Sequence, residues 1–308
     1  MGQEPMAKSE RNIGSYRQFH KYVKSMTSES MKKAYDQGYY QTMVGGKEVS
    51  DAFFDSKGLE PTRYTRLPIQ LAHIRPGDRI IDIGCGRGEV VFQTAGSGAT
   101  SIGIDYSPSA IKIALETRES HDEGMRSRTS FLCRNALDPG FEDYSFDKAF
   151  LLDVVEHVAG SELRAMFREI NRLLTSRGVL IIHTTQNIWS RKMGYWLKAA
   201  VYRTFRGSHL THPVIREYQE MKADPDYDED KIFLHINEQS VFGLKVELAL
   251  CGFRSAVWLG NTGNPWLNSD SPSGRILSAL FQLTGMKYLF RSDIYAVAHP
   301  SKSMLRKP

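Results

Sequence analysis

The sequence has few of the features that mark membrane-spanning, secreted or lipid-anchored proteins. No uninterrupted apolar run approaches the roughly 18 residues that a membrane-spanning helix needs. The N-terminus has no apolar stretch of the kind found in signal peptides. Met6 stands where a myristoylation signal has Ser or Thr. We therefore expect a cytoplasmic protein, with contact at the inner face of a membrane as the alternative.

Cysteine is scarce and charge is nearly balanced. The 308 residues include three cysteines in scattered positions, and an odd, scattered set favours reduced thiols over a disulfide framework. The formal net charge is +5, with acidic and basic residues mostly interspersed. This composition does not call for nucleic acid as a partner.

The most informative stretch is a glycine-rich turn between a predicted strand and a predicted helix. Residues 79–82 have the apolar character of a buried strand and end at Asp82, and three glycines follow at alternate positions from Gly84. Glycine lets the backbone approach a ligand closely. The dinucleotide fingerprint is G-x-G-x-x-G, whereas here Glu89 stands where its third glycine would fall. Asp82 would repel a pyrophosphate and would hold a ligand that carries an ammonium group.

The rest of the chain alternates predicted strands with predicted helices. An acid, Asp105, ends the second predicted strand, and an acid at that position accepts hydrogen bonds from a ribose, in NAD enzymes as well as others. The charged residues 119–128 predict a surface loop. Further strands are predicted at 129–133, 146–152, 179–182, 255–259 and 294–298, and helices at 61–74, 163–174 and 241–250.

The glycine turn, its preceding acid and the acid after strand two resemble the cofactor motifs of class I S-adenosylmethionine (SAM) methyltransferases, of the UbiE/UbiG-like kind. The resemblance implies an α/β, Rossmann-like, mostly parallel sheet with helices on both faces. It implies SAM as the cofactor and S-adenosylhomocysteine as the product. The residues it assigns to the cofactor are Asp82, Gly84, Cys85, Gly86, Gly88, Asp105, Tyr106, Asn135, Ala136 and Asp153.

The resemblance also divides the chain into four segments. We expect an N-terminal helical lid at 1–58, a SAM-binding core at 59–187, a substrate-lid insert after strand five at 188–232, and the C-terminal half of the core, with an amphipathic excursion, at 233–308. The insert and the excursion carry aromatic and aliphatic stripes. Such stripes usually pack on a core or form a dimer interface. Alternatively, they hold an amphipathic acceptor near an anionic membrane surface.

Three histidines are candidates for a catalytic base. His157 leads, because it lies just beyond strand four and histidine titrates near physiological pH. A structural role, capping the next helix, is its alternative. His183 and His235 are weaker candidates. A second alternative is a divalent metal site made of Asp153, Glu156, His157 and His235, since some methyltransferase families carry a similar cluster, with Glu in the first position.

The predicted function is therefore SAM-dependent methyl transfer to a small-molecule, saccharide or lipid-linked acceptor, with O-methylation by a His base as the leading mechanism. Motifs of base-methylating and radical SAM enzymes are missing from the sequence. The alternatives are metal-assisted O-methylation, N- or C-methylation, and a catalytically silent SAM-binding interaction protein. The expected partners are the acceptor and a second copy of the chain in a homodimer.

Overall fold

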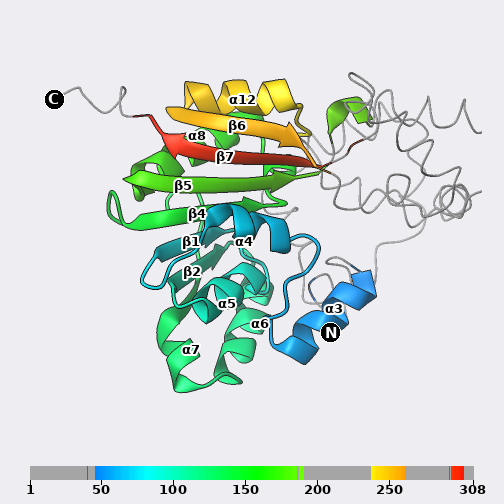
Figure 1. The fold of residues 1–308 in the computed structure, drawn as a ribbon, viewed down its shortest axis with the longest axis vertical. Helices are drawn as coiled ribbons and strands as arrows, with labels where there is room; N and C mark the ends of the chain where they lie inside the picture. The colour runs from blue at the N-terminus through cyan, green and yellow to red at the C-terminus, as the bar shows by residue number, and fades with distance from the viewer. Residues whose placement is uncertain are drawn as a thin grey trace, which may run out of the picture.

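The computed structural model describes Tyr40 and residues 46–185, 187–190, 237–260, 291 and 293–301. These residues form a seven-stranded sheet in the order β3-β2-β1-β4-β5-β7-β6 (Figure 1). The described strands pair in parallel, except that β7 runs antiparallel to β5 and β6. The strands are β1 Arg79–Ile83, β2 Thr100–Asp105, β3 Thr129–Cys133, β4 Phe146–Leu152, β5 Leu174–Thr184, β6 Phe253–Leu259 and β7 Ile294–Pro300.

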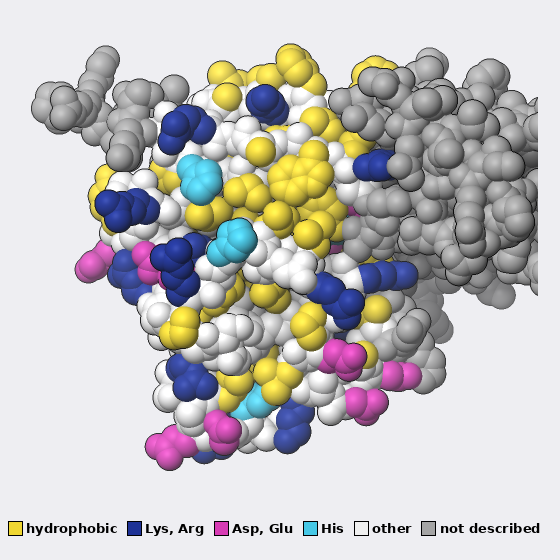
Figure 2. All heavy atoms as spheres, viewed as in Figure 1, with side chains coloured by type: hydrophobic (Ala, Val, Ile, Leu, Met, Phe, Trp, Pro, Cys, Tyr) yellow, Lys and Arg dark blue, Asp and Glu magenta, His cyan; other side chains and the backbone are white. Residues whose placement is uncertain are grey.

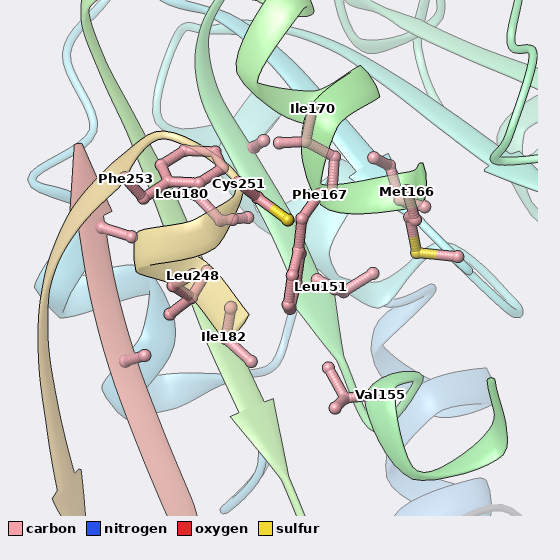
Figure 3. Close-up of a cluster of buried hydrophobic side chains, with 14 of the residues drawn as sticks. Leu151, Val155, Met166, Phe167, Ile170, Leu180, Ile182, Leu248, Cys251 and Phe253 are labelled. Atoms are coloured by element: carbon pink, nitrogen blue, oxygen red, sulfur yellow. The ribbon is translucent and has the colours of Figure 1, made fainter. Parts of the chain in front are cut away.

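Helices cover both faces of this sheet. Because side chains alternate along a strand, Leu180 and Ile182 of β5 join the core under α8 and α12, while Ile181 joins the core on the α4 and α5 side. Figure 3 shows the first of these cores, with Phe167 of α8 and Leu248 of α12 beside Ile182. The helices are α3 Gly46–Ser56, α4 Arg66–Ala72, α5 Glu89–Gly96, α6 Pro108–Glu119, α7 Glu123–Arg128, the short 3-10 helix η3 Val155–His157, α8 Gly160–Leu173 and α12 Val241–Leu250.

The predicted fold class is confirmed, with differences in the bounds of several elements. The helix predicted at 61–74, for example, spans only Arg66–Ala72. The predicted surface loop at 119–128 is wrong, because residues Glu123–Arg128 form α7. The Asp122 side chain accepts a hydrogen bond from the Met125 amide at 2.8 Å, and Met125 is buried. A helix cap and one buried apolar side chain are thus enough to form this short helix. The fifth strand also begins earlier than predicted, at Leu174, which pairs with Phe146 across a register shift.

Hydrophobic side chains gather on the face shown in Figure 2, over the half of the sheet that holds β5, β7 and β6. No helix among the described residues is long and apolar enough to cross a membrane. The excursion at 274–290, nearly all of the insert at 188–232, and His235 lie outside the described residues. Their predicted roles stay predictions.

Candidate functional site

Parallel pairing brings the carboxyl ends of β1, β2 and β4 to one edge of the sheet. Ligands of open α/β sheets bind at this edge. Asp82 lies near the end of β1, Asp105 ends β2, and Asp153 follows β4 directly. The sheet therefore brings together three acids that are far apart in the sequence.

The turn after β1 requires glycine for steric reasons. Gly84, Gly86 and Gly88 have φ angles of 73°, 52° and 94°, which only glycine adopts readily. A Cβ on Gly84 would collide with Val154, and one on Gly88 would lie 2.5 Å from Cε1 of Phe131. Close packing on both sides thus fixes the path of the loop.

Asp105 fastens this loop to the end of β2. Its carboxylate accepts hydrogen bonds from the Gly86 amide at 3.0 Å and the Ser107 amide at 2.8 Å, and the residue is 5% exposed. Burial raises the pKa of Asp105, although these amide donors lower it. Each carboxylate oxygen has two acceptor positions, so the side chain can also accept hydrogen bonds from a diol.

Asp82 is an acid in an unfavourable place. It is 3% exposed, and its pKa is raised well above the ordinary value, first by burial and then by the negative charges of Glu89 and Asp105. A bound cation would favour the carboxylate form and relieve this repulsion. The loop is therefore suited to a ligand that carries a positive charge.

The remaining residues assigned to the cofactor surround the loop to different degrees. Tyr106 is half-buried after β2, and Asn135 is exposed after β3, with its Oδ1 accepting a hydrogen bond from the Leu137 amide at 3.0 Å. Ala136 is half-buried against the core. The Cys85 side chain points into the sheet, because a Cβ on Gly103 would lie 2.7 Å from its sulfur, so Cys85 offers a ligand its backbone only.

The segment after β4 contacts the glycine loop through Val154 and carries His157 three residues later. His157 is half-buried on η3, and Val154, three residues earlier, packs against Gly84. Glu156 is fully buried and accepts hydrogen bonds from the hydroxyls of Thr184 at 2.7 Å and Thr185 at 3.2 Å. Burial raises the pKa of Glu156, against the opposing effect of His157. Glu156 thus joins the segment after β4 to the end of β5.

His183 lies in a different environment, fully buried at the end of β5 between two acids. Its Nδ1 lies 2.9 Å from Oδ1 of Asp153, in an ion pair rather than an aligned hydrogen bond, and its Nε2 lies 3.4 Å from Oδ1 of Asp293. Burial by itself would lower the pKa of His183, but Asp153 and Asp293 raise it to about 10. The two carboxylates therefore favour the protonated, imidazolium form of His183. Asp153 holds it from a backbone with φ of 53°.

The alternative metal site is incomplete within the described part of the chain, which contains no group of three potential ligands close enough to hold an ion. Asp153 is directed to His183, and Glu156 is directed to two threonines.

Two residues of this region were missed from the sequence. Asp293 meets His183 across 110 residues, so no local pattern could reveal it. Arg87, between two glycines of the loop, is buried and bonds to Tyr40 and Ser50. The signal for Arg87 was its charge inside a glycine turn.

Comparisons with known proteins agree with this geometry. The methyltransferase domain family matches residues 81–182. The 24-methylenesterol C-methyltransferase 2 of Oryza sativa subsp. japonica is 26% identical over 46% of this chain and 35% of its own length. The ubiquinone biosynthesis O-methyltransferase of Azorhizobium caulinodans is 32% identical over 36% of this chain and 42% of its own length. The chain thus spans less than half of either relative.

A solved structure extends the match to the wider fold. The SAM-dependent methyltransferase from Methanosarcina mazei superposes with a TM-score of 0.51 at 19% identity, covering 76% of this chain and 97% of that one. The similarity at this identity concerns the fold, while the matched family concerns the glycine loop and the strands that follow it. Residues 81–182 thus match the methyltransferase domain family, and the wider described fold is similar to that of a solved SAM-dependent methyltransferase.

Proposed function

We propose that the chain transfers a methyl group from SAM to a hydroxyl of a small-molecule, saccharide or lipid-linked acceptor, with His157 as the base. One observation carries the proposal: the packing of Val154 against Gly84 sets the His157 segment directly against the glycine loop that Asp105 holds in place. Cofactor and base would then meet at the same edge of the sheet.

The residues of the loop fit SAM by charge and shape. SAM supplies a methyl group that its sulfonium already activates. Asp82 would hold the cationic amino-acid end with Gly84 and Gly86, since the described part of the chain provides no compensating cation for this buried carboxylate. Asp105 would accept the ribose hydroxyls. Tyr106 would border the adenine, with Asn135 and Ala136 at its amino edge.

A hydroxyl acceptor needs a group that takes its proton. His157 is half-buried and lies three residues after Val154, which contacts the loop, so we expect it to be within reach of an acceptor bound there. His183 is a poorer base, because two carboxylates hold its proton and it is fully buried. His235 lies outside the described residues. The side chain that best fits the role of base is therefore that of His157.

The test separates binding from turnover. The purified protein is incubated with SAM carrying an isotope-labelled methyl group and a metabolite extract, and labelled products are sought by mass spectrometry. We expect His157→Ala to lower the rate by about 10²–10⁴-fold, the usual contribution of a general base, with S-adenosylhomocysteine affinity unchanged. His121→Ala is the control, because His121 contacts the Lys57 carbonyl on the outer surface. Full turnover by the His157→Ala protein would refute the assignment of His157 as the base.

The acceptor class, membrane contact and the homodimer belong to the same proposal. The two relatives named above are, by their names, a C-methyltransferase and an O-methyltransferase, so the proposal of O-methylation rests on His157 alone.

The basic, apolar start of the 188–232 insert supports contact with anionic lipid. Co-sedimentation with anionic liposomes, weakened by salt, would support it, and a protein that stays in the supernatant at low salt would exclude it. Equilibrium sedimentation tests the homodimer.

A further inference from the structure

Arg87 is the most deeply buried charged side chain of the glycine loop, at 1% exposed. One terminal nitrogen, Nη1, donates hydrogen bonds to the Tyr40 carbonyl and to Oγ of Ser50, both at 3.0 Å. The other, Nη2, donates to Oε1 of Glu89 at 2.7 Å. The guanidinium thus joins the loop to two positions at the N-terminal side of the molecule.

The surroundings of Arg87 make these contacts hard to replace. Its guanidinium carbon lies 4.5 Å from the centre of the Phe53 ring on α3, which is an energetically favourable place for a cation. Its Nε is buried and has no hydrogen-bond partner among the residues that the structure describes. If Tyr40 and α3 moved away together, the Arg87 guanidinium would keep its hydrogen bond to Glu89 but lose the partners that Tyr40, Ser50 and Phe53 provide. Burying a charge without partners is costly, so the loop and α3 hold each other.

The same segment reaches the part of the loop that faces the cofactor site. A Cβ built on Gly86 would lie 3.6 Å from Cε1 of Tyr40, so the tyrosine ring lies against this glycine. The Gly86 amide, in turn, donates to Asp105. A continuous path of contacts therefore runs from α3 through Arg87 and Gly86 to the carboxylate proposed to hold the ribose.

We propose that Arg87 is a positioning residue that couples docking of the N-terminal cap, here defined as Tyr40 and α3, to cofactor binding. The inference rests on the proposed cofactor site. A ligand that fixes Gly86 and Asp105 also fixes Arg87, and this favours the docked cap. By reciprocity, the docked cap raises affinity for the cofactor by the same factor. If the docked state of the cap is less populated, the apparent affinity for the cofactor falls in proportion.

The experiment measures both directions of this coupling without any acceptor. Amide hydrogen exchange of α3 is followed by mass spectrometry with and without S-adenosylhomocysteine, and its affinity is measured by calorimetry. In the unmodified protein we expect the ligand to slow exchange in α3. In Arg87→Met we expect that slowing to be lost and the affinity to fall at least about tenfold, since hydrogen bonds to a charged group are lost.

Two further variants keep the test decisive. Ser50→Ala removes one acceptor on the cap and leaves the loop sequence intact, so it should weaken affinity several-fold and reduce the slowing even if Arg87→Met does not fold. Arg118→Met is the matched control. Arg118 also donates to backbone carbonyls, those of Thr129 and Arg126, but away from the cap, so the ligand should still slow exchange in α3.

The outcomes separate this inference from the proposed function. If the ligand binds but leaves α3 exchange unchanged, or if Ser50→Ala and Arg87→Met keep full affinity, the coupling is refuted and the cofactor site stands. If the folded, unmodified protein does not bind S-adenosylhomocysteine, the proposed function fails and the coupling fails with it.

Discussion

Replacing Asp105 by alanine should separate its two roles, fixing the glycine loop and holding the ribose. In the protein without ligand, the Gly86 and Ser107 amides lose a carboxylate acceptor at 3.0 and 2.8 Å. The loss of a buried carboxylate, whose pKa burial has raised, offsets part of that cost. We therefore expect a modest change in the free energy of unfolding and a larger change in ligand affinity.

The affinity change follows from the hydrogen bonds that the ribose would lose. Hydrogen bonds to a charged group contribute about 1.5–3 kcal/mol each, and 1.4 kcal/mol is a factor of ten. Asp105→Ala should therefore weaken S-adenosylhomocysteine binding at least about tenfold, and Asp105→Asn, which keeps one acceptor oxygen, should fall in between. Calorimetry at fixed pH measures both.

Asp78 provides the control for this experiment. It lies just before β1, at the opposite edge of the sheet, and also accepts a backbone hydrogen bond, from the Arg75 amide at 2.8 Å. Asp78→Ala should leave the affinity unchanged. A folded Asp105→Ala protein that binds as tightly as the original would refute the assignment of the ribose site.

Two further predictions concern the glycine loop. Because folding raises the pKa of Asp82, its carboxylate destabilises the unliganded fold as pH rises through that pKa. The Asp82→Asn protein should therefore be at least as stable as the original without ligand. It should bind SAM more weakly, and its affinity should not fall in acid, whereas that of the original protein should. Calorimetry and urea unfolding between about pH 5 and 8 test this, and tight, acid-sensitive binding by the variant would contradict it. Gly88→Ala should lower the free energy of unfolding by about 1–3 kcal/mol more than Gly77→Ala does. Both glycines have positive φ, but a Cβ on Gly88 would collide with Phe131, while a Cβ on Gly77 meets nothing within 4 Å. Equal urea midpoints for the two variants would contradict this and show that the loop can adjust.

The fold could be predicted where one short pattern decides the structure. The strands at 129–133 and 146–152 and the helix at 241–250 have the predicted bounds. Each of these elements is short and rich in apolar residues, so little tertiary information is needed to locate it. α7 was missed because its stability rests on a cap and on Met125, against a charged background.

The site could be predicted where chain order and sheet topology coincide. Asp82 and Asp105 lie at the carboxyl ends of consecutive parallel strands, so their placement at one edge follows from the fold alone. The environment of His183 could not be predicted, because it depends on Asp293, which directly precedes the antiparallel strand β7 far along the chain. Arg87 illustrates the same limit: its partners lie 37 and 47 residues earlier, and no periodic pattern links them.

The most direct test of the central claim is a crystal structure of the chain grown with S-adenosylhomocysteine. The account predicts the amino-acid end at Asp82, Gly84 and Gly86, the ribose hydroxyls on the Asp105 carboxylate, and the adenine between Tyr106 and Asn135. A ligand bound elsewhere, or a ribose that does not contact Asp105, would contradict it.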